Sequence, residues 1–192
     1  MSGEFASMTA LYNTIPDSVP IPMAWGTYET DPNIHFFLCS FVDMFDELPD
    51  VQSFTAKVAE LHTKGVSPNG KYGFPVPTFV GRMRQYTTWA GSWEDFYANS
   101  LRQLMSVIEE AEGPDPEFKE LLEATINKVV PRLLRPLETG GRQIQPRLVH
   151  GDLYAGNVSL DVATGAPILY DATCLYAHNE CKLDCIDTNS PR

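Results

Sequence analysis

The sequence predicts an α+β fold in which a short, partly stranded N-terminal part precedes a larger, mainly helical part. Residues 35–42 form a continuous apolar run of strand length, whereas residues 51–134 place apolar side chains at helical spacing. Two short strand-like stretches around a turn follow at residues 158–170. With 192 residues, 43% of them hydrophobic and 20% charged, the chain has ordinary globular composition, which excludes a mainly disordered protein.

The net charge and the lengths of the apolar runs decide which classes of partner we expect. Asp and Glu number 25 against 14 Lys and Arg, giving a formal net charge of −11. Binding to nucleic acid or to an anionic membrane surface needs clustered Lys and Arg, so we expect neither. We find no apolar run of about 18 residues and no basic, apolar leader at the start, so we expect a cytoplasmic protein without a membrane partner.

The N-terminal part is predicted to hold one helix and two or three strands. Residues 3–13 place Phe5, Met8 and Leu11 at helical spacing, and a proline-containing strand follows at residues 19–26. The apolar run at residues 35–42 suggests a strand covered on both faces. Residues 43–50 are acidic and turn-like, so we interpret them as a connector.

Capping residues mark where the helices of the larger part begin. Asp50 is expected to cap a helix over residues 51–62, which Gly65 ends. Residues 65–92 are rich in Gly, Pro and aromatic residues and are predicted to form an ordered, irregular excursion.

Two further helices follow this excursion. Ser92 with Asp95 resembles a capping box, and Asp115 before Pro116 has the order favoured at a helix start. Because proline lacks an N–H group, Pro131 is expected to kink or end the last of these helices.

The residues most informative about function form the stretch His150-Gly-Asp152-Leu-Tyr-Ala-Gly-Asn157, followed by the predicted hairpin and Asp171. Phosphoryl transfer needs a carboxylate beside the attacking hydroxyl and oxygen ligands for Mg²⁺. An Asp and an Asn at this spacing, with a second Asp after the next hairpin, are typical of kinases. An Asp-x-x-x-x-Asn pair alone more often caps turns, but the whole pattern favours the kinase interpretation. We expect His150 to orient the loop through a backbone hydrogen bond.

This loop resembles the catalytic loop of the aminoglycoside-phosphotransferase-like kinases, which share the protein-kinase fold. Four further stretches resemble one branch of them, the fructosamine/ketosamine kinases, including fungal protein-ribulosamine 3-kinases. These stretches are residues 3–10, 71–74, 93–96 and 168–180. The resemblance implies an α+β, protein-kinase-like fold with a partial small lobe and hinge over residues 1–44, an incomplete, mainly helical large lobe over residues 45–181, and a divergent tail over residues 182–192.

The resemblance also implies an activity and a set of roles. Such enzymes use ATP and Mg²⁺ to phosphorylate the 3-hydroxyl of a ketosamine, on a protein or as a small molecule, in a deglycation repair step. Asp152 would be the base, and Asn157 and Asp171 would hold the metal. The stretch Ser40-Phe41-Val42 would be the hinge that meets adenine, and Glu4 would pair with a strand lysine.

Several expected features are missing from the sequence. No glycine-rich loop or strand lysine precedes Glu4, and the match ends after Cys181. We therefore expect the chain as given to bind nucleotide weakly and to have little or no kinase activity. A catalytically inactive truncated remnant, or a pseudokinase-like binding module, is the first alternative, and an aminoglycoside-type phosphotransferase is the second. The aromatic residues at positions 74–79 and 89–93 either pack a core or form an apolar wall that receives the sugar adduct.

Overall fold

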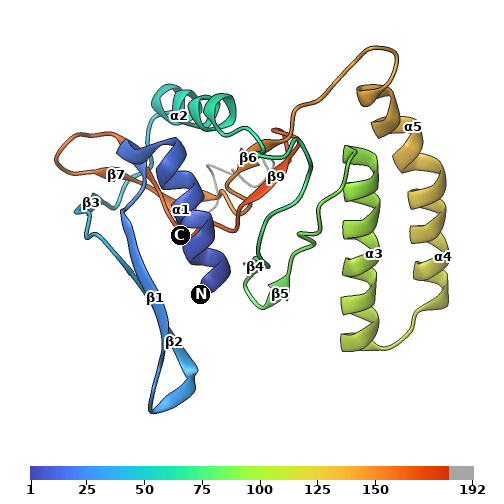
Figure 1. The fold of residues 1–192 in the computed structure, drawn as a ribbon, viewed down its shortest axis with the longest axis horizontal. Coiled ribbons are helices and arrows are strands. Elements are labelled where there is room, and N and C mark those ends of the chain that lie inside the picture. The colour runs from blue at the N-terminus through green and yellow to red at the C-terminus, as the bar shows by residue number, and fades with distance from the viewer. Residues whose placement is uncertain (182–192) are drawn as a thin grey trace.

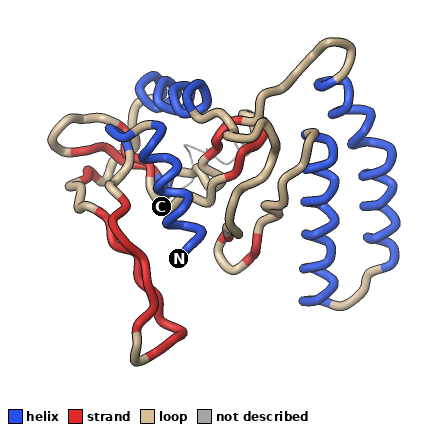
Figure 2. The backbone as a smooth tube through the Cα atoms, in the orientation of Figure 1, coloured by secondary structure: helices blue, strands red, loops and turns tan. Residues whose placement is uncertain are grey.

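The computed structural model describes residues 1–181, and the predicted divergent tail, residues 182–192, lies outside them. Within residues 1–181 the strands form three small two-stranded sheets and one three-stranded sheet. Figures 1 and 2 show their arrangement. The N-terminal part holds helix α1 and the hairpin of β1 and β2, as predicted. Their bounds are α1 (Ser2–Thr14), the 3₁₀ turn η1 (Pro16–Ser18), β1 (Pro22–Tyr28) and β2 (Asp31–Cys39).

The remaining helices lie in two places. Helix α2 covers the central strands, whereas α3 stands beside α4 and α5 at one end of the molecule (Figure 1). The helices are α2 (Val51–Lys64), α3 (Trp93–Glu112), α4 (Pro116–Ala124) and α5 (Val130–Leu134), with the 3₁₀ turn η3 (Arg135–Glu138) after α5.

Short antiparallel strands hold the centre of the molecule together. The predicted hairpin over residues 158–170 is confirmed as β7 paired with β8, and β3 joins the free side of β7. Strand β6 pairs with β9, and β4 pairs with β5 within the predicted irregular excursion. The bounds are β3 (Met44–Phe45), β4 (Phe79–Val80), β5 (Met83–Arg84), β6 (Arg147–Val149), β7 (Val158–Asp161), β8 (Pro167–Leu169) and β9 (Leu175–Ala177).

Side-chain caps fix the starts of the helices at the predicted residues. The Asp50 carboxylate accepts hydrogen bonds from the backbone N–H groups of Gln52 and Ser53 at 2.9 and 3.0 Å. Asp115 caps α4 in the same way, through the N–H of Phe118. Each cap satisfies N–H groups that have no partner within the helix, so the chain changes direction at these points.

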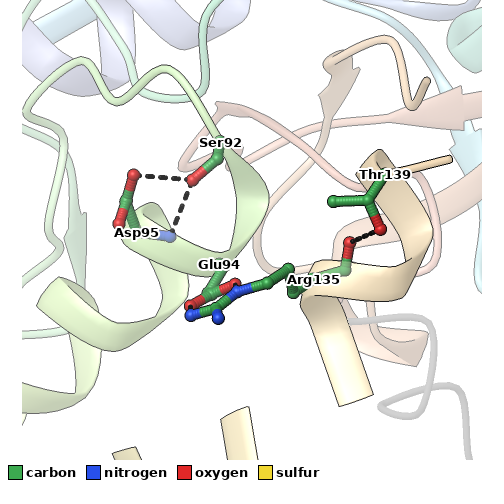
Figure 3. A network of polar contacts seen from close by, with 5 residues as sticks. All are labelled: Ser92, Glu94, Asp95, Arg135 and Thr139. Carbon is green, nitrogen blue, oxygen red and sulfur yellow. Dashed lines mark hydrogen bonds and ion pairs between the residues drawn. The ribbon is translucent and has the colours of Figure 1, made fainter. Parts of the chain in front are cut away.

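The start of α3 is also tied to the end of α5 (Figure 3). Ser92 Oγ accepts from the N–H of Asp95 at 3.1 Å and donates to its carboxylate at 2.7 Å, which confirms the predicted cap. Arg135 donates two hydrogen bonds to the carboxylate of Glu94, at 2.6 and 2.8 Å. This bidentate pair joins the first turn of α3 to η3, which directly follows α5.

The helix that contains Pro131 continues past it. Residues Thr125–Val129 form a π-helical turn, and α5 begins at Val130. Proline leaves the carbonyl one turn earlier without a donor, and the wider π turn accommodates this change of register. The predicted kink therefore takes the form of a π turn before Pro131.

The prediction that the strand within residues 35–42 is covered on both faces is wrong. Strand β2 pairs only with β1 among the described residues, and the hairpin extends away from the rest of the chain (Figure 1). Ile34, Phe36 and Leu38 are each at least 40% exposed. Phe37 alone reaches the core region, where its ring meets Phe5 of α1 edge to face at 6.1 Å. An apolar run does not reveal which layers surround a strand.

One hydrophobic core joins the two parts of the chain. It contains Met8 and Leu11 of α1 together with Phe54 and Leu61 of α2 and Leu169 of β8. The predicted acidic connector, residues 43–50, also contains the short strand β3, whose partner β7 is far away in the sequence. The lobe boundary near residue 44 stays a prediction.

Gly3 gives a test of the packing of α1. A Cβ atom at Gly3 would lie 2.2 Å from the Pro77 carbonyl oxygen. An alanine inside a helix normally stabilises it by about 0.5–1 kcal/mol relative to glycine. Here we expect Gly3→Ala to lower the free energy of unfolding by about 1–3 kcal/mol, as overpacked sites do. Denaturant titration measures this change. Gly91→Ala is the matched control, because no atom lies within 4 Å of a Cβ there.

Candidate active site

The loop from His150 to Asn157 lies between β6 and β7, and a close backbone contact determines its path. Gly151 has φ of +85°, and a Cβ atom there would lie 2.0 Å from the Thr173 carbonyl oxygen. No side chain fits at this position. The N–H of Thr173 donates to the carbonyl of His150 at 2.9 Å, so two distant stretches of backbone are bound side by side.

His150 is buried beneath the loop and orients it, as predicted. Its Nε2 lies 3.0 Å from the Tyr170 carbonyl oxygen, which can only accept, so Nε2 carries the proton. Its Nδ1 is then free to accept from the N–H of Asp152 at 3.4 Å. Burial lowers the pKa of His150 from 6.5 to about 4, so the ring is neutral near pH 7 and does not act there as a cation.

Asn157 holds the two acidic residues of the pattern together. Its Nδ2 donates to the backbone carbonyl of Asp152 at 2.8 Å and approaches both the Asp152 carboxylate and the Asp171 carbonyl at 3.4 Å. The N–H of Tyr170 donates to the Asn157 carbonyl at 3.1 Å. The structure thus brings together Asp152, Asn157 and Asp171 at one end of the β7–β8 hairpin.

Asp152 and Asp171 line a cavity of ≈ 270 Å³ between the loop and the irregular excursion. Asp171 has φ of +55°, a left-handed conformation that Asp tolerates better than most residues. The opposite wall comes from the turn of the β4–β5 hairpin. The lining residues are Met1, Glu4, Thr78, Phe79, Gly81, Asp152, Asp171, Ala172 and Thr173.

Glu4 reaches this cavity from the first turn of α1. Burial, and then the charge of Asp171, raise the pKa of its carboxyl group. Within residues 1–181, no Lys or Arg forms an ion pair with Glu4, so the cationic partner implied by the resemblance is not found there.

The residues expected to form the hinge do not line this cavity. The Ser40 N–H donates to the Ile21 carbonyl at 2.9 Å, so it cannot also bind a nucleotide base. Phe41 is 89% exposed, and its backbone groups and those of Val42 have no hydrogen bond within the described part of the chain. The backbone of Phe41 and Val42 therefore remains available for the hinge role, which stays a prediction.

Of the aromatic residues at positions 74–79 and 89–93, some pack in the core and one lines the cavity. Phe74 and Trp93 belong to the core, and the Trp89 ring stacks on that of Tyr176 at 6.0 Å. Phe79 instead lines the cavity and is 46% exposed. No sequence pattern points to Thr78 or Gly81 individually, because the β4–β5 hairpin brings them to the cavity.

The donor set fits a hard divalent cation. Because Asn157 donates through Nδ2, its Oδ1 is left to act as a ligand, and it accepts no hydrogen bond from any described residue. Asp171 adds a carboxylate. Among residues 1–181 no group of three His, Cys, Asp or Glu side chains comes together as a metal site. Mg²⁺ commonly takes one or two protein ligands and completes its shell with phosphate oxygens and water.

Comparison with known proteins agrees with this geometry. The model of the family described as fructosamine kinase matches residues 1–189. A protein-ribulosamine 3-kinase of Oryza sativa subsp. japonica is 31% identical over 179 residues, which cover 93% of this chain and 49% of that protein. The ketosamine-3-kinase of Mus musculus is 29% identical over 204 residues, covering 94% and 62%. The chain thus spans about half the length of the rice relative.

Solved structures show the same fold. A candidate fructosamine-3-kinase from Haemophilus somnus 129PT superposes with a TM-score of 0.70 at 20% identity, covering 99% of this chain and 59% of that one. A second, from Thermobifida fusca YX-ER1, also gives 0.70 at 20% identity, covering 93% and 56%. The predicted α+β, kinase-like fold is confirmed. In the described part of the chain, no helix is both long enough and apolar enough to cross a membrane.

The buried His150 predicts a defined acid instability. Its pKa is about 4 in the folded chain against 6.5 for an unperturbed histidine, so the unfolded state binds the proton first. The neutral His150 ring contributes fully to the free energy of unfolding above pH 6.5. This contribution is lost as the pH falls toward 4, and the total loss is about 3 kcal/mol. Unfolding free energies between pH 7 and 4 should therefore fall less steeply in His150→Gln than in the wild type. Equal slopes would contradict the buried, neutral ring. Taking the difference between the two proteins removes the contribution of His62, whose pKa burial also lowers.

Proposed function

The chain belongs to the fructosamine kinase family, and from that premise we propose that it transfers the γ-phosphoryl group of ATP to the 3-hydroxyl of a ketosamine. The observation that carries the proposal is the grouping of Asp152 and Asp171, which line the cavity, around the buried amide of Asn157. The proposed acceptors are ribulosamine and fructosamine adducts of protein amines and their small-molecule counterparts.

Asp152 is the proposed base. The sugar hydroxyl would donate a hydrogen bond to the Asp152 carboxylate, and its oxygen would attack the γ-phosphorus while the bond to the β-phosphate oxygen breaks. The hydroxyl proton passes to Asp152, and ADP leaves. The contact of Asp152 with the Asn157 amide at 3.4 Å helps to hold the carboxylate in one orientation.

Asn157 Oδ1 and the Asp171 carboxylate are the proposed ligands of Mg²⁺. When bound, the ion supplies charge neutralisation for the phosphate oxygens. The left-handed backbone at Asp171 and the hydrogen bond from Tyr170 to Asn157 support this role, because they hold both ligands from the backbone. Phe79 and the β4–β5 turn form the proposed wall against which the acceptor sugar lies.

Phosphorylation at the 3-position destabilises a ketosamine and lets the protein amine regenerate, so the proposed place of the reaction is deglycation repair. A cytoplasmic location stays a prediction. The rice relative is described as chloroplastic, which concerns that protein.

An inactive or weakly active chain is the second candidate. The observation that favours it is the raised pKa of Glu4, which shares the cavity with Asp171 and forms no ion pair with a Lys or Arg among residues 1–181. In active kinases a lysine paired with this helix glutamate contacts the phosphates. The relatives reported above are ketosamine and ribulosamine kinases, and none supports the aminoglycoside alternative.

Asp152→Asn tests the proposed base. With MgATP and a ribulosamine-bearing peptide, we expect slow formation of the 3-phosphate, below the roughly 1–100 s⁻¹ typical of kinases. Asp152→Asn should lower this rate by about 10²–10⁴-fold, because the amide cannot accept the hydroxyl proton. Mass spectrometry of the peptide measures both rates, with Glu120→Gln on α4 as an exposed control. An unchanged rate in Asp152→Asn would exclude the base role, and no transfer by the wild type would favour the second candidate.

Asp171→Asn tests the proposed metal ligand separately. Asn also tolerates a left-handed backbone, so the substitution should keep the local fold while it removes the carboxylate. We expect the affinity for Mn²⁺–ATP, used as a paramagnetic probe of the magnesium site, to fall by about tenfold or more. Electron paramagnetic resonance titration measures it. Asp161→Asn, on the neighbouring turn, should leave the affinity unchanged.

A further inference from the structure

A buried carboxamide connects the two walls of the candidate cavity from behind. Gln85 follows β5 in the irregular excursion and is 8% exposed. Its side chain reaches Thr173, on the wall that carries Asp171, while its backbone belongs to the β4–β5 hairpin, on the opposite wall. The Gln85 N–H donates to the Thr78 carbonyl at 2.9 Å, which extends the pairing of that hairpin.

The donor and acceptor roles of this carboxamide are fixed by its neighbours. Gln85 Nε2 lies 2.8 Å from the Thr173 carbonyl oxygen and 3.1 Å from Thr78 Oγ1. Since a carbonyl only accepts, the nitrogen must face Thr173, and its two hydrogens serve these two partners. A buried bond of this kind is costly to break, because the carbonyl left behind has no water to replace its donor.

Thr173 is the point at which this bond reaches the catalytic loop. The same carbonyl oxygen that accepts from Gln85 lies 2.0 Å from where a Cβ of Gly151 would be, and the Thr173 N–H donates to the His150 carbonyl. Gln85, Thr173 and the start of the loop therefore form one hydrogen-bonded unit. Asp152 directly follows this unit at Gly151, and Asp171 lies two residues before Thr173.

We propose that Gln85 is a positioning residue, which sets the distance between the acceptor wall at Thr78–Gly81 and the carboxylates of Asp152 and Asp171. The inference rests on the proposed phosphoryl transfer and adds a residue that touches neither substrate nor metal. Misplacing reacting groups by about 1 Å can lower the rate on the order of 10²-fold. The reaction rate is therefore sensitive to the distance that this hydrogen bond sets between the two walls.

The chain offers a matched control on the outer side of the same hairpin. Gln103 of α3 donates through Nε2 to the Arg84 carbonyl at 2.8 Å. It thus anchors the β4–β5 hairpin with the same chemical group and the same bond length, but it makes no hydrogen bond to Thr173. Gln85→Met and Gln103→Met each remove one carboxamide and keep a similar side-chain volume.

The test compares these two variants in the full chain by hydrogen exchange and by kinetics. We expect Gln85→Met to speed exchange of the Thr173 and Asp152 amides by about tenfold, to lower kcat by about 10–100-fold, and to change KM for ATP less than threefold. Gln103→Met should leave all three readouts within about twofold. Unchanged exchange at residues 150–157 in Gln85→Met, or equal effects in both variants, would overturn the proposal.

Two additional measurements keep the test decisive. If Gln85→Met does not fold, Gln85→Asn takes its place. The shorter side chain cannot reach the Thr173 carbonyl, so this variant should behave as Gln85→Met. If the wild type transfers no phosphate, the proposed function has failed. Exchange and Mn²⁺–ATP affinity then still decide whether Gln85 shapes the site, with unchanged values counting against it.

Discussion

The contact between the backbones of Gly151 and Thr173 is the constraint on which the rest of the site depends. It requires a residue without a side chain at 151, and it aligns the loop with the stretch that follows β8. His150 can then bridge Tyr170 and Asp152 from below, and Asn157 can bridge Asp152 and Asp171 from the side. The hydrogen bonds among the three polar residues of the site therefore depend on a packing condition between main-chain atoms.

Much of the fold could be predicted because its signals are local. Asp50, Ser92 and Asp115 cap helices through N–H groups at most three residues away, and β7 meets β8 across a short turn. The pairing of β3 with β7 and of β6 with β9 joins residues far apart in the sequence, which no local pattern records. The exposure of β2 was mispredicted for the same reason, since the apolarity of a strand does not identify its neighbours.

In the candidate site, too, the residues that share a local pattern could be predicted and those brought in from a distance could not. The spacing of Asp152, Asn157 and Asp171 could be recognised in the sequence, because the loop and the hairpin that carry them are contiguous. The structure brings the three residues together as expected. The acceptor wall at Thr78–Gly81 could not be predicted, because no local pattern in that stretch indicates which distant loop it faces. Glu4 arrives through α1, where the glycine at position 3 allows the helix to approach Pro77 closely.

The β1–β2 hairpin has a consequence for how this chain behaves in concentrated solution. Register places Trp25 beside Phe37 on one face and Leu38 beside Ala24 on the other, so the ribbon is apolar on both sides and has unpaired edges within the described chain. Such ribbons can stack or extend one another edge to edge. The net charge of −11 opposes this through long-range repulsion, which added salt screens. Colloidal stability of the protein is therefore governed by ionic strength, and salting-out should begin at the hairpin.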